Sequence, residues 1–376
     1  MDLFRNKVLL YPILLGFGVW SVLRLLATSP VLALTVPYSN IERIVFDSKI
    51  LIFQELEKNI LSKESKPYGI VFGTSKSSAF EPEEVRKVIG ENDLLLYSFN
   101  VPMGCPSYYY YWWEKIEALS YKTGKYPKFI ILESDVFQFG EQSVRFTLDN
   151  SYDSGFILRG FWNRLLGLKG PGWNLEETVF YFSRAIFPIY SYTISTKGIS
   201  ENWKYFDTSD GKKERAVFLK EKFRKEFLDR TLALGGSYPN LYLGDTSYQA
   251  LHRQTEEGIS RYFLGYKALD GQKKYYKSLL DSFAEKKIPT IVYWPIFPDH
   301  LARELDKLSH VSQTKKALLE IVWETGRENP DWKWRIADPQ EENRVSCRAF
   351  SDVYHLSGGC FPELTAYLLG KEAFKK

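Results

Sequence analysis

Short apolar runs alternate with amphipathic stretches along most of the chain, and this alternation predicts the fold class. Five runs have the length of a strand, and stretches with apolar positions at helical spacing separate them. Strand, helix and strand in succession predict an α/β fold, a flavodoxin-like three-layer α/β/α sandwich with about five parallel strands. The predicted strands are 68–72, 93–99, 128–132, 289–295 and 332–337.

A long segment between the third and fourth predicted strands interrupts this regular pattern. Residues 142–262 are aromatic, charged and mostly helical in pattern, with glycine and proline breaks at GLKGPGW and GGSYPN. We expect a helical insertion or cap, which divides the sandwich into a first half at 67–141 and a second half at 263–376. The helices predicted within the two halves are 81–90, 108–123, 272–286, 312–325 and 361–371.

The N-terminal segment 1–36 carries an unbroken uncharged stretch that ends at Arg24. The stretch is slightly short for a bilayer core, but Arg24 can extend toward the lipid headgroups and so lengthen the span. Arg5 and Lys7 precede it and favour an N-terminus inside. The segment predicts an uncleaved signal-anchor with the C-terminal domain on the far side of the membrane, and a juxtamembrane helix at 37–66. A cleaved signal peptide and a buried helix are the alternatives.

Composition narrows the classes of function. The net charge is only +4, and acidic and basic residues are interspersed. The sequence therefore lacks the clustered basic residues that are typical of nucleic-acid-binding proteins. Three cysteines without a CxxC pair exclude a disulfide framework and a zinc motif. Cys347 and Cys360 can form one bridge in an oxidising compartment or remain buried thiols. No pattern calls for a metal or another cofactor, because the four histidines are scattered and lack HxH or HxxxH spacing.

Polar residues that follow the predicted strands are the candidates for chemistry, because sites in open parallel sheets form beyond the carboxyl ends of the strands. Glu133, Ser134 and Asp135 follow the third strand, and the pair Asp299 and His300 follows the fourth. After the first and second strands come Thr74, Ser75, Lys76, Asn100 and Gly104.

Ser75, Asp352 and His355 form a possible catalytic set. Asp352 and His355 are three residues apart, so the carboxylate can orient an imidazole whose other nitrogen takes a proton from a serine hydroxyl. A helix-capping serine and a loop histidine beside a capping aspartate explain the same residues without catalysis. The pair Asp299 and His300 is a rival acid and base. Two further interpretations stay open: Lys76 is a solvated lysine or attracts an anion, and the aromatic run 108–113 is helix core or a sugar platform.

The motifs VFGTSKS and FSDVYHLS together resemble the SGNH (GDSL-like) hydrolase superfamily. Within it the chain is most similar to the DltD/AlgJ-type extracytoplasmic acyltransfer proteins of bacteria and their uncharacterised relatives. The resemblance implies that Ser75 is the nucleophile, His355 the general base and Asp352 its orienting group. It also implies an oxyanion hole formed by the backbone N–H of Ser75 or Lys76, that of Gly104 and the side chain of Ser134, with substrate contacts at Asn100 and Thr74.

The chain departs from that superfamily at two motifs. Thr74 replaces the acid of GDS, and ESD stands where GxND is expected. Glu133 and Asp135 accept hydrogen bonds when ionised, so neither can stabilise an oxyanion in that state, whereas Ser134 can donate.

The resemblance implies an esterase or O-acyltransferase at the bacterial cytoplasmic membrane. Its domain would face the periplasm, act on a cell-envelope glycan, lipid or polymer, and work beside a polytopic membrane acyltransferase. A catalytically inactive envelope-assembly or carbohydrate-binding protein is the alternative, and a metal-dependent enzyme is a third.

Overall fold

A computed structural model describes residues 7–26, 41–168, 170–186, 212–240 and 247–370. The chain divides into two compact units, and each is described by itself. One unit comprises 1–44 and 175–227, and the other comprises 45–174 and 228–376. The second unit holds the sheet and all of the candidate residues named above.

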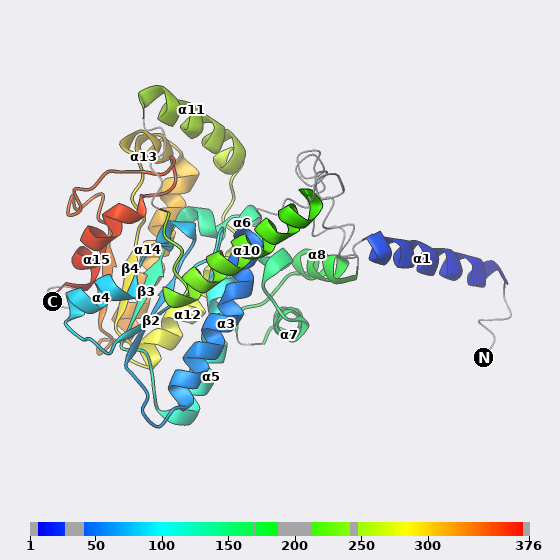
Figure 1. Cartoon of the computed structure of the whole chain (residues 1–376), viewed down its shortest axis with the longest axis horizontal. Helices are drawn as coiled ribbons and strands as arrows, with labels where there is room; N and C mark the ends of the chain where they lie inside the picture. Colours follow the sequence, from blue (N-terminus) through cyan, green and yellow to red (C-terminus); the bar gives the residue numbers. More distant parts are fainter. Residues whose placement is uncertain (1–6, 27–40, 169, 187–211, 241–246, 371–376) are drawn as a thin grey trace. The chain divides into compact units, whose positions relative to one another are not determined.

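The core of this second unit is a parallel sheet of five strands (Figure 1). Its strand order is β2-β1-β3-β4-β5, with every neighbouring pair parallel. This is the doubly wound order that leaves a crevice where the chain switches direction beside β1. The strands are β1 (Tyr68–Phe72), β2 (Leu95–Ser98), β3 (Phe129–Glu133), β4 (Thr290–Tyr293) and β5 (Trp334–Ala337).

Helices cover both faces of the sheet (Figure 1). On one face, α4 (Pro82–Ile89) and α15 (Phe361–Leu369) pack against each other and share an apolar cluster with the strands. On the other face lie α5 (Pro106–Thr123), α12 (Asp270–Glu285) and α14 (Ser309–Glu328). Outside α5, helix α3 (Ile41–Leu61) packs Phe46 and Phe53 against it.

The predicted α/β class and the five parallel strands are confirmed, but one helix was not predicted. Helix α13 (Asp299–Asp306) occupies residues for which no element was predicted. It is short, and its inward-facing Leu301 and Leu305 are too few to give a clear helical period. In the aromatic run, all residues but Tyr110 are buried in α5, which confirms the interpretation of this run as helix core.

The chain between β3 and β4 is largely helical. In the second unit it forms η2 (Val136–Phe139), α6 (Glu141–Asn150), α7 (Ser154–Leu165), α11 (Tyr248–Gly258) and η5 (Ile259–Phe263). Helix α8 (Leu175–Ile186) belongs to the first unit, and α10 (Lys212–Ala233) runs across the division. Residues 187–211 and 241–246 of the predicted insertion lie outside the described residues, so its limits stay a prediction.

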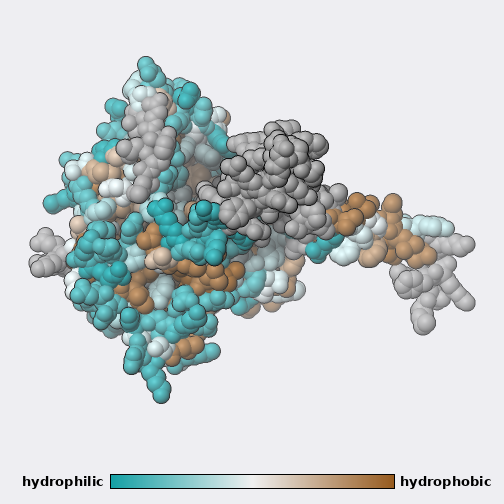
Figure 2. Space-filling view, in the orientation of Figure 1, coloured by the Kyte–Doolittle hydropathy of each residue, from teal (hydrophilic) through white to brown (hydrophobic). Residues whose placement is uncertain are grey.

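The N-terminal unit contains α1 (Lys7–Leu26), along which apolar side chains are exposed (Figure 2). No helix in the described ranges combines the length and the apolar character that crossing a bilayer requires. The membrane span predicted within 1–36 is therefore not found, and residues 1–6 and 27–36 of that segment lie outside the described residues.

Candidate functional site

Ser75 lies on a tight turn directly after β1. A single turn of 3-10 helix, η1 (Ser75–Ser77), begins at this half-buried serine. Thr74 caps the turn, because its side-chain oxygen accepts a hydrogen bond of 3.2 Å from the Lys76 N–H. Gly73 lets the chain fold back closely, since a Cβ at this position would collide with the Ser77 Oγ. The turn therefore holds the Ser75 hydroxyl at the carboxyl end of β1.

The buried carboxylate of Glu133 fixes this turn from the neighbouring strand. It accepts hydrogen bonds from the Thr74 N–H at 3.0 Å and the Thr74 hydroxyl at 2.6 Å. It also accepts from the Ser77 hydroxyl and, at 2.8 Å, from the Gln138 side chain. A carboxylate can stay buried only where donors replace the water it loses, and these four donors do so. Glu133 is thus a positioning residue for the turn.

A series of hydrogen bonds that begins at α3 also supports the turn. The buried Lys49 ammonium donates to Asn100 Oδ1 at 3.2 Å, and the Asn100 amide donates to the Ser77 carbonyl at 2.6 Å. Lys49 also donates to the carbonyls of Ser98 and Gly236, at 3.1 and 2.5 Å. Burial lowers the pKa of Lys49 well below its usual value, because no carboxylate accompanies it in these contacts. Asn100 therefore supports the turn from behind.

Lys76 forms a buried ion pair beside Ser75. Its Nζ lies 2.6 Å from Asp135 Oδ2, and both side chains are less than a tenth exposed. Burial alone would lower the pKa of Lys76, but the charges of Asp135 and then Glu133 raise it above its usual value. Lys76 is therefore a paired cation inside the protein, and the interpretation of it as a solvated lysine is wrong.

His355 reaches Ser75 from the opposite end of the sequence. Its Nε2 lies 2.7 Å from Ser75 Oγ, and its Nδ1 lies 2.8 Å from both carboxylate oxygens of Asp352. Asp352 also accepts from the N–H groups of Tyr354 and His355, at 2.7 and 3.0 Å. Burial alone would raise the pKa of Asp352, but the hydrogen bond and charge of His355 and these two N–H groups lower it. An ionised Asp352 favours the tautomer with its proton on Nδ1, which leaves Nε2 free to accept the proton of Ser75.

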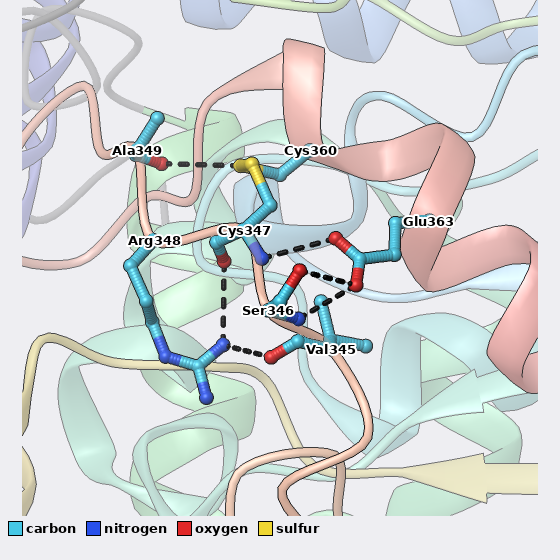
Figure 3. The surroundings of a disulfide bond; sticks show 7 residues. All are labelled: Val345, Ser346, Cys347, Arg348, Ala349, Cys360 and Glu363. Carbon is cyan, nitrogen blue, oxygen red and sulfur yellow. Dashed lines mark hydrogen bonds between the residues drawn. A yellow bond between two sulfur atoms is a disulfide. The ribbon is translucent and has the colours of Figure 1, made fainter.

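A disulfide closes the segment that carries Asp352 and His355. Cys347 and Cys360 are bonded, so the structure favours the bridge over the free thiols (Figure 3). On α15, the Glu363 carboxylate accepts from the Ser346 N–H at 2.7 Å and the Cys347 N–H at 3.0 Å. The segment is therefore tied to the start of α15 at both of its ends.

Ser75 and His355 open into a pocket with a mostly apolar wall. The pocket has about 570 Å³ of empty space, including its open mouth. Gly258 makes room for one wall residue, because a Cβ there would overlap the Tyr354 hydroxyl. Besides Ser75 and His355, the pocket is lined by Thr74, Lys76, Met103, Asp135, Phe137, Tyr262, Phe263, Phe297, Leu301, Leu305 and Tyr354.

The structure brings together some of the predicted site residues and separates others. Ser75, His355 and Asp352 form one hydrogen-bonded series, and Thr74 and Lys76 line the pocket beside it. The Gly104 N–H already donates to the Val101 carbonyl at 3.1 Å. Ser134 and Asn100 are fully buried and do not line this pocket. Gly104, Ser134 and Asn100, which were assigned to the oxyanion hole and substrate contacts, thus lie away from the pocket wall or have their donor engaged.

The rival pair at the end of β4 does not join this series. Asp299 is exposed at the start of α13, and neither it nor His300 lines the pocket. The His300 ring instead packs against His252 of α11, with ring centroids 4.8 Å apart. The arrangement favours His355 over His300 as the partner of Ser75.

Sequence reasoning missed the residues that position the turn and the wall of the pocket. Glu133 was considered only as a failed oxyanion donor, although a carboxylate at the end of the apolar run FIIL signals a buried acceptor that needs several donors. Lys49 on the amphipathic α3 gave no such signal, because a lysine on a helix is usually solvated. Leu301 and Leu305 were missed together with their helix.

Within the part of the chain that the structure describes, no group of three or more His, Cys, Asp or Glu side chains is placed to hold a metal ion.

The comparisons with known proteins add a family but not a function. The chain belongs to the family described as "Protein of unknown function (DUF1574)", which matches residues 3–371. No curated protein matches the chain.

Proposed function

We propose that this member of the DUF1574 family is a serine-dependent acyl-transfer enzyme, an esterase or an O-acyltransferase of SGNH type. One observation carries the proposal: Ser75 Oγ, the His355 imidazole and the Asp352 carboxylate form a continuous series of contacts of 2.7 and 2.8 Å at the mouth of a pocket. A nucleophile, a base within hydrogen-bond reach and a group that orients the base are the parts that nucleophilic catalysis requires.

The reaction follows from these contacts. Ser75 Oγ attacks the carbonyl carbon of an acyl ester while its proton moves to His355 Nε2. The tetrahedral intermediate expels the alcohol, which takes that proton from His355, and an acyl-Ser75 ester remains. Water or the hydroxyl of an acceptor then attacks this ester with His355 as its base. The proton returns to Ser75 as the product leaves, and Asp352 stabilises the imidazolium in both steps.

The oxyanion donors of this proposal keep the Ser75 N–H that the superfamily resemblance implies, but replace Gly104 and Ser134. Because the Gly104 N–H is engaged and Ser134 is buried, we assign this role to backbone N–H groups at the pocket wall. The N–H groups of Ser75 and Met103 donate no hydrogen bond within the described ranges, and both residues line the pocket. Two such donors supply the electrostatic stabilisation that acyl transfer needs.

In this proposal the domain works outside the cytoplasm, at the bacterial cytoplasmic membrane. The disulfide between Cys347 and Cys360 supports an oxidising compartment. Exposed apolar side chains along α1 support contact with lipid, among them Ile13, Leu14, Leu15, Phe17, Val22 and Leu25. The cell-envelope glycan, lipid or polymer substrate and the polytopic acyltransferase partner stay predictions from the resemblance.

Covalent labelling of the full-length chain with a fluorophosphonate tests the proposal. We expect one adduct, on Ser75, found by intact mass and peptide mapping and lost in Ser75→Ala and His355→Ala. Ser78→Ala is the matched control, because Ser78 lies on the same turn without a hydrogen bond to His355. An adduct elsewhere, or none on a folded chain, would overturn the proposal.

A second function, a binding protein without catalysis, is favoured by the engaged Gly104 N–H and the buried Ser134. If that function holds, the chain gives no adduct but still binds an envelope glycan or lipid, which titration of the unlabelled chain measures.

A further inference from the structure

We propose that the pocket beside Ser75 binds the acyl part of the substrate, and that this part is an uncharged alkyl chain rather than an acetyl, aminoacyl or dicarboxylic acyl group. This inference rests on the proposed acyl transfer at Ser75 and adds the chemical class of the group transferred.

The first argument is the chemistry of the wall. Ser75 and His355 lie at the pocket, so an acyl group bound to Ser75 must extend along its wall. That wall consists mainly of carbon surface from η2, η5, α13 and the residues just before α13. An alkyl chain gains free energy there by leaving water, and it gains more than an acetyl group, which has only one methyl group to bury. The apolar wall residues are Phe137, Tyr262, Phe263, Phe297, Leu301 and Leu305.

The second argument is charge. The pocket is lined by one cation and one buried anion, Lys76 and Asp135, which pair with each other at 2.6 Å. The Lys76 ammonium also lies 5.1 Å from the ring centre of Phe137 and 5.7 Å from that of Phe297. With its cation and anion already matched, the pocket holds no spare charge for a charged acyl group. Burying an ammonium or a carboxylate there would cost its hydration without a partner in return.

The third argument is depth. Leu301 is 0% exposed and Phe263 is 3% exposed, whereas Ser75 and Tyr262 are half-buried. We therefore assign the closed end of the pocket to Leu301 on α13 and its partly open end to Ser75. The alkyl chain of an acyl group attached to Ser75 would contact Leu301 with its far carbons. Leu301 would therefore limit the length of the acyl group.

The test is the burst of p-nitrophenol that the full-length chain releases from p-nitrophenyl esters. Hexanoate, 6-aminohexanoate and the half-ester of adipate have the same chain length and differ in the terminal charge. We expect the hexanoate to acylate Ser75 at least about tenfold faster than the acetate, since each buried methylene contributes about fourfold. We expect both charged esters to react more than tenfold slower than the hexanoate.

The outcomes separate the two proposals. A burst that persists in Ser75→Ala would overturn the proposed function. A burst that depends on Ser75 but is as fast with the acetate or with a charged ester would overturn the acyl pocket alone. Hexanamide has no ester bond, so its binding measured by calorimetry tests the pocket without catalysis. Hexanamide should bind, and 6-aminohexanamide should not; the reverse would overturn the inference even in an inactive chain.

Shortening the residue at the closed end sharpens the test. Leu301→Ala should move the preferred ester from hexanoate to a longer chain, such as decanoate. Leu318→Ala is the matched control, because Leu318 is also 0% exposed but belongs to α14 and does not line the pocket. If Leu301→Ala fails to fold, Leu305→Ala serves in its place, since Leu305 lines the same wall from the same helix. An unchanged chain-length preference in a folded variant would contradict the assignment of the closed end.

Discussion

The turn that carries Ser75 and the segment that carries His355 are held in place by different means. Buried hydrogen bonds hold the turn, chiefly to Glu133, which is 0% exposed. The other segment is more exposed: the His355 side chain is 31% exposed and that of Asp352 is 42% exposed. A covalent bond between Cys347 and Cys360 holds that segment together.

The difference shows how one site can be assembled from unequal parts. A strand-to-helix turn inside a sheet can be fixed by neighbouring strands, so its precision comes with the fold. The segment around His355 is anchored by Phe350 and Leu356 in the apolar core, and the cross-link restricts it further by removing conformations from the unfolded chain. We therefore expect mutations at the turn to change stability and activity together, and changes in the segment to affect activity more selectively.

The largest expected effect comes from the imidazole itself. His355→Ala should lower kcat of ester hydrolysis by about 10³- to 10⁴-fold, because Ser75 loses its proton acceptor. The free energy of unfolding should change little, since the side chain is partly exposed. Steady-state ester hydrolysis and denaturant unfolding measure the two quantities. His252→Ala, which removes a partly exposed histidine from α11, is the control and should retain activity. A comparable loss in both variants would contradict the role of His355.

Glu133→Gln should produce the largest loss of stability, about 3 kcal/mol. The amide replaces one carboxylate oxygen with a donor, so at least one of the four groups that donate to Glu133 loses its acceptor in the interior. Activity should fall with stability because the turn shifts. Denaturant unfolding checks the value. Glu285→Gln makes the same change at a side chain that is 72% exposed and should stay within about 0.5 kcal/mol of the unmodified protein. Equal stability of the two variants would show that Glu133 does not hold the turn.

Removing the disulfide should lower stability less than Glu133→Gln does. It should leave the conformation of the turn that carries Ser75 unchanged. Cys347→Ser with Cys360→Ser opens a loop with a sequence separation of 13, which costs up to about 3 kcal/mol in the chain-entropy description and usually less. Catalysis should fall about tenfold as His355 becomes less well placed. The reduced unmodified protein should behave like this variant, and the variant should not respond to reductant. Full activity after reduction would contradict the role of the bridge.

The same contrast explains which parts of the site could be predicted from the sequence. The strands and the residues after them follow from apolar runs, so Ser75 was placed at the carboxyl end of β1. Asp352 and His355 were paired because their interaction is local, three residues along the chain. The contacts of Glu133 and Lys49 join residues up to 187 positions apart, and no local pattern encodes them.

The hydrogen-bond partners of the predicted oxyanion residues could not be inferred from the sequence for a related reason. Whether the Gly104 N–H is free depends on how the loop after β2 closes, and here it donates to Val101. Met103 has a left-handed φ of 52°, which is rare for a residue other than glycine. No sequence motif predicts this conformation. Hydrogen-bond partners of loop backbone groups are set by tertiary packing, so they could not be inferred from residue types.

The smallest expected effect is the pH dependence that Asp352 gives to the exposed segment. Because its pKa in the folded protein is lowered, the ionised carboxylate stabilises the fold above the usual pKa of aspartate, about 4, and this contribution disappears as the pH falls through the lowered value. Between pH 5 and 8, Asp352 should therefore add no slope to stability. Denaturant unfolding of Asp352→Asn should show a deficit that is constant above about pH 5 and shrinks below about pH 4. The exposed Asp299, substituted by Asn, is the control, and a deficit that instead grows in acid would mean that the His355 contact does not hold Asp352 in its ionised form.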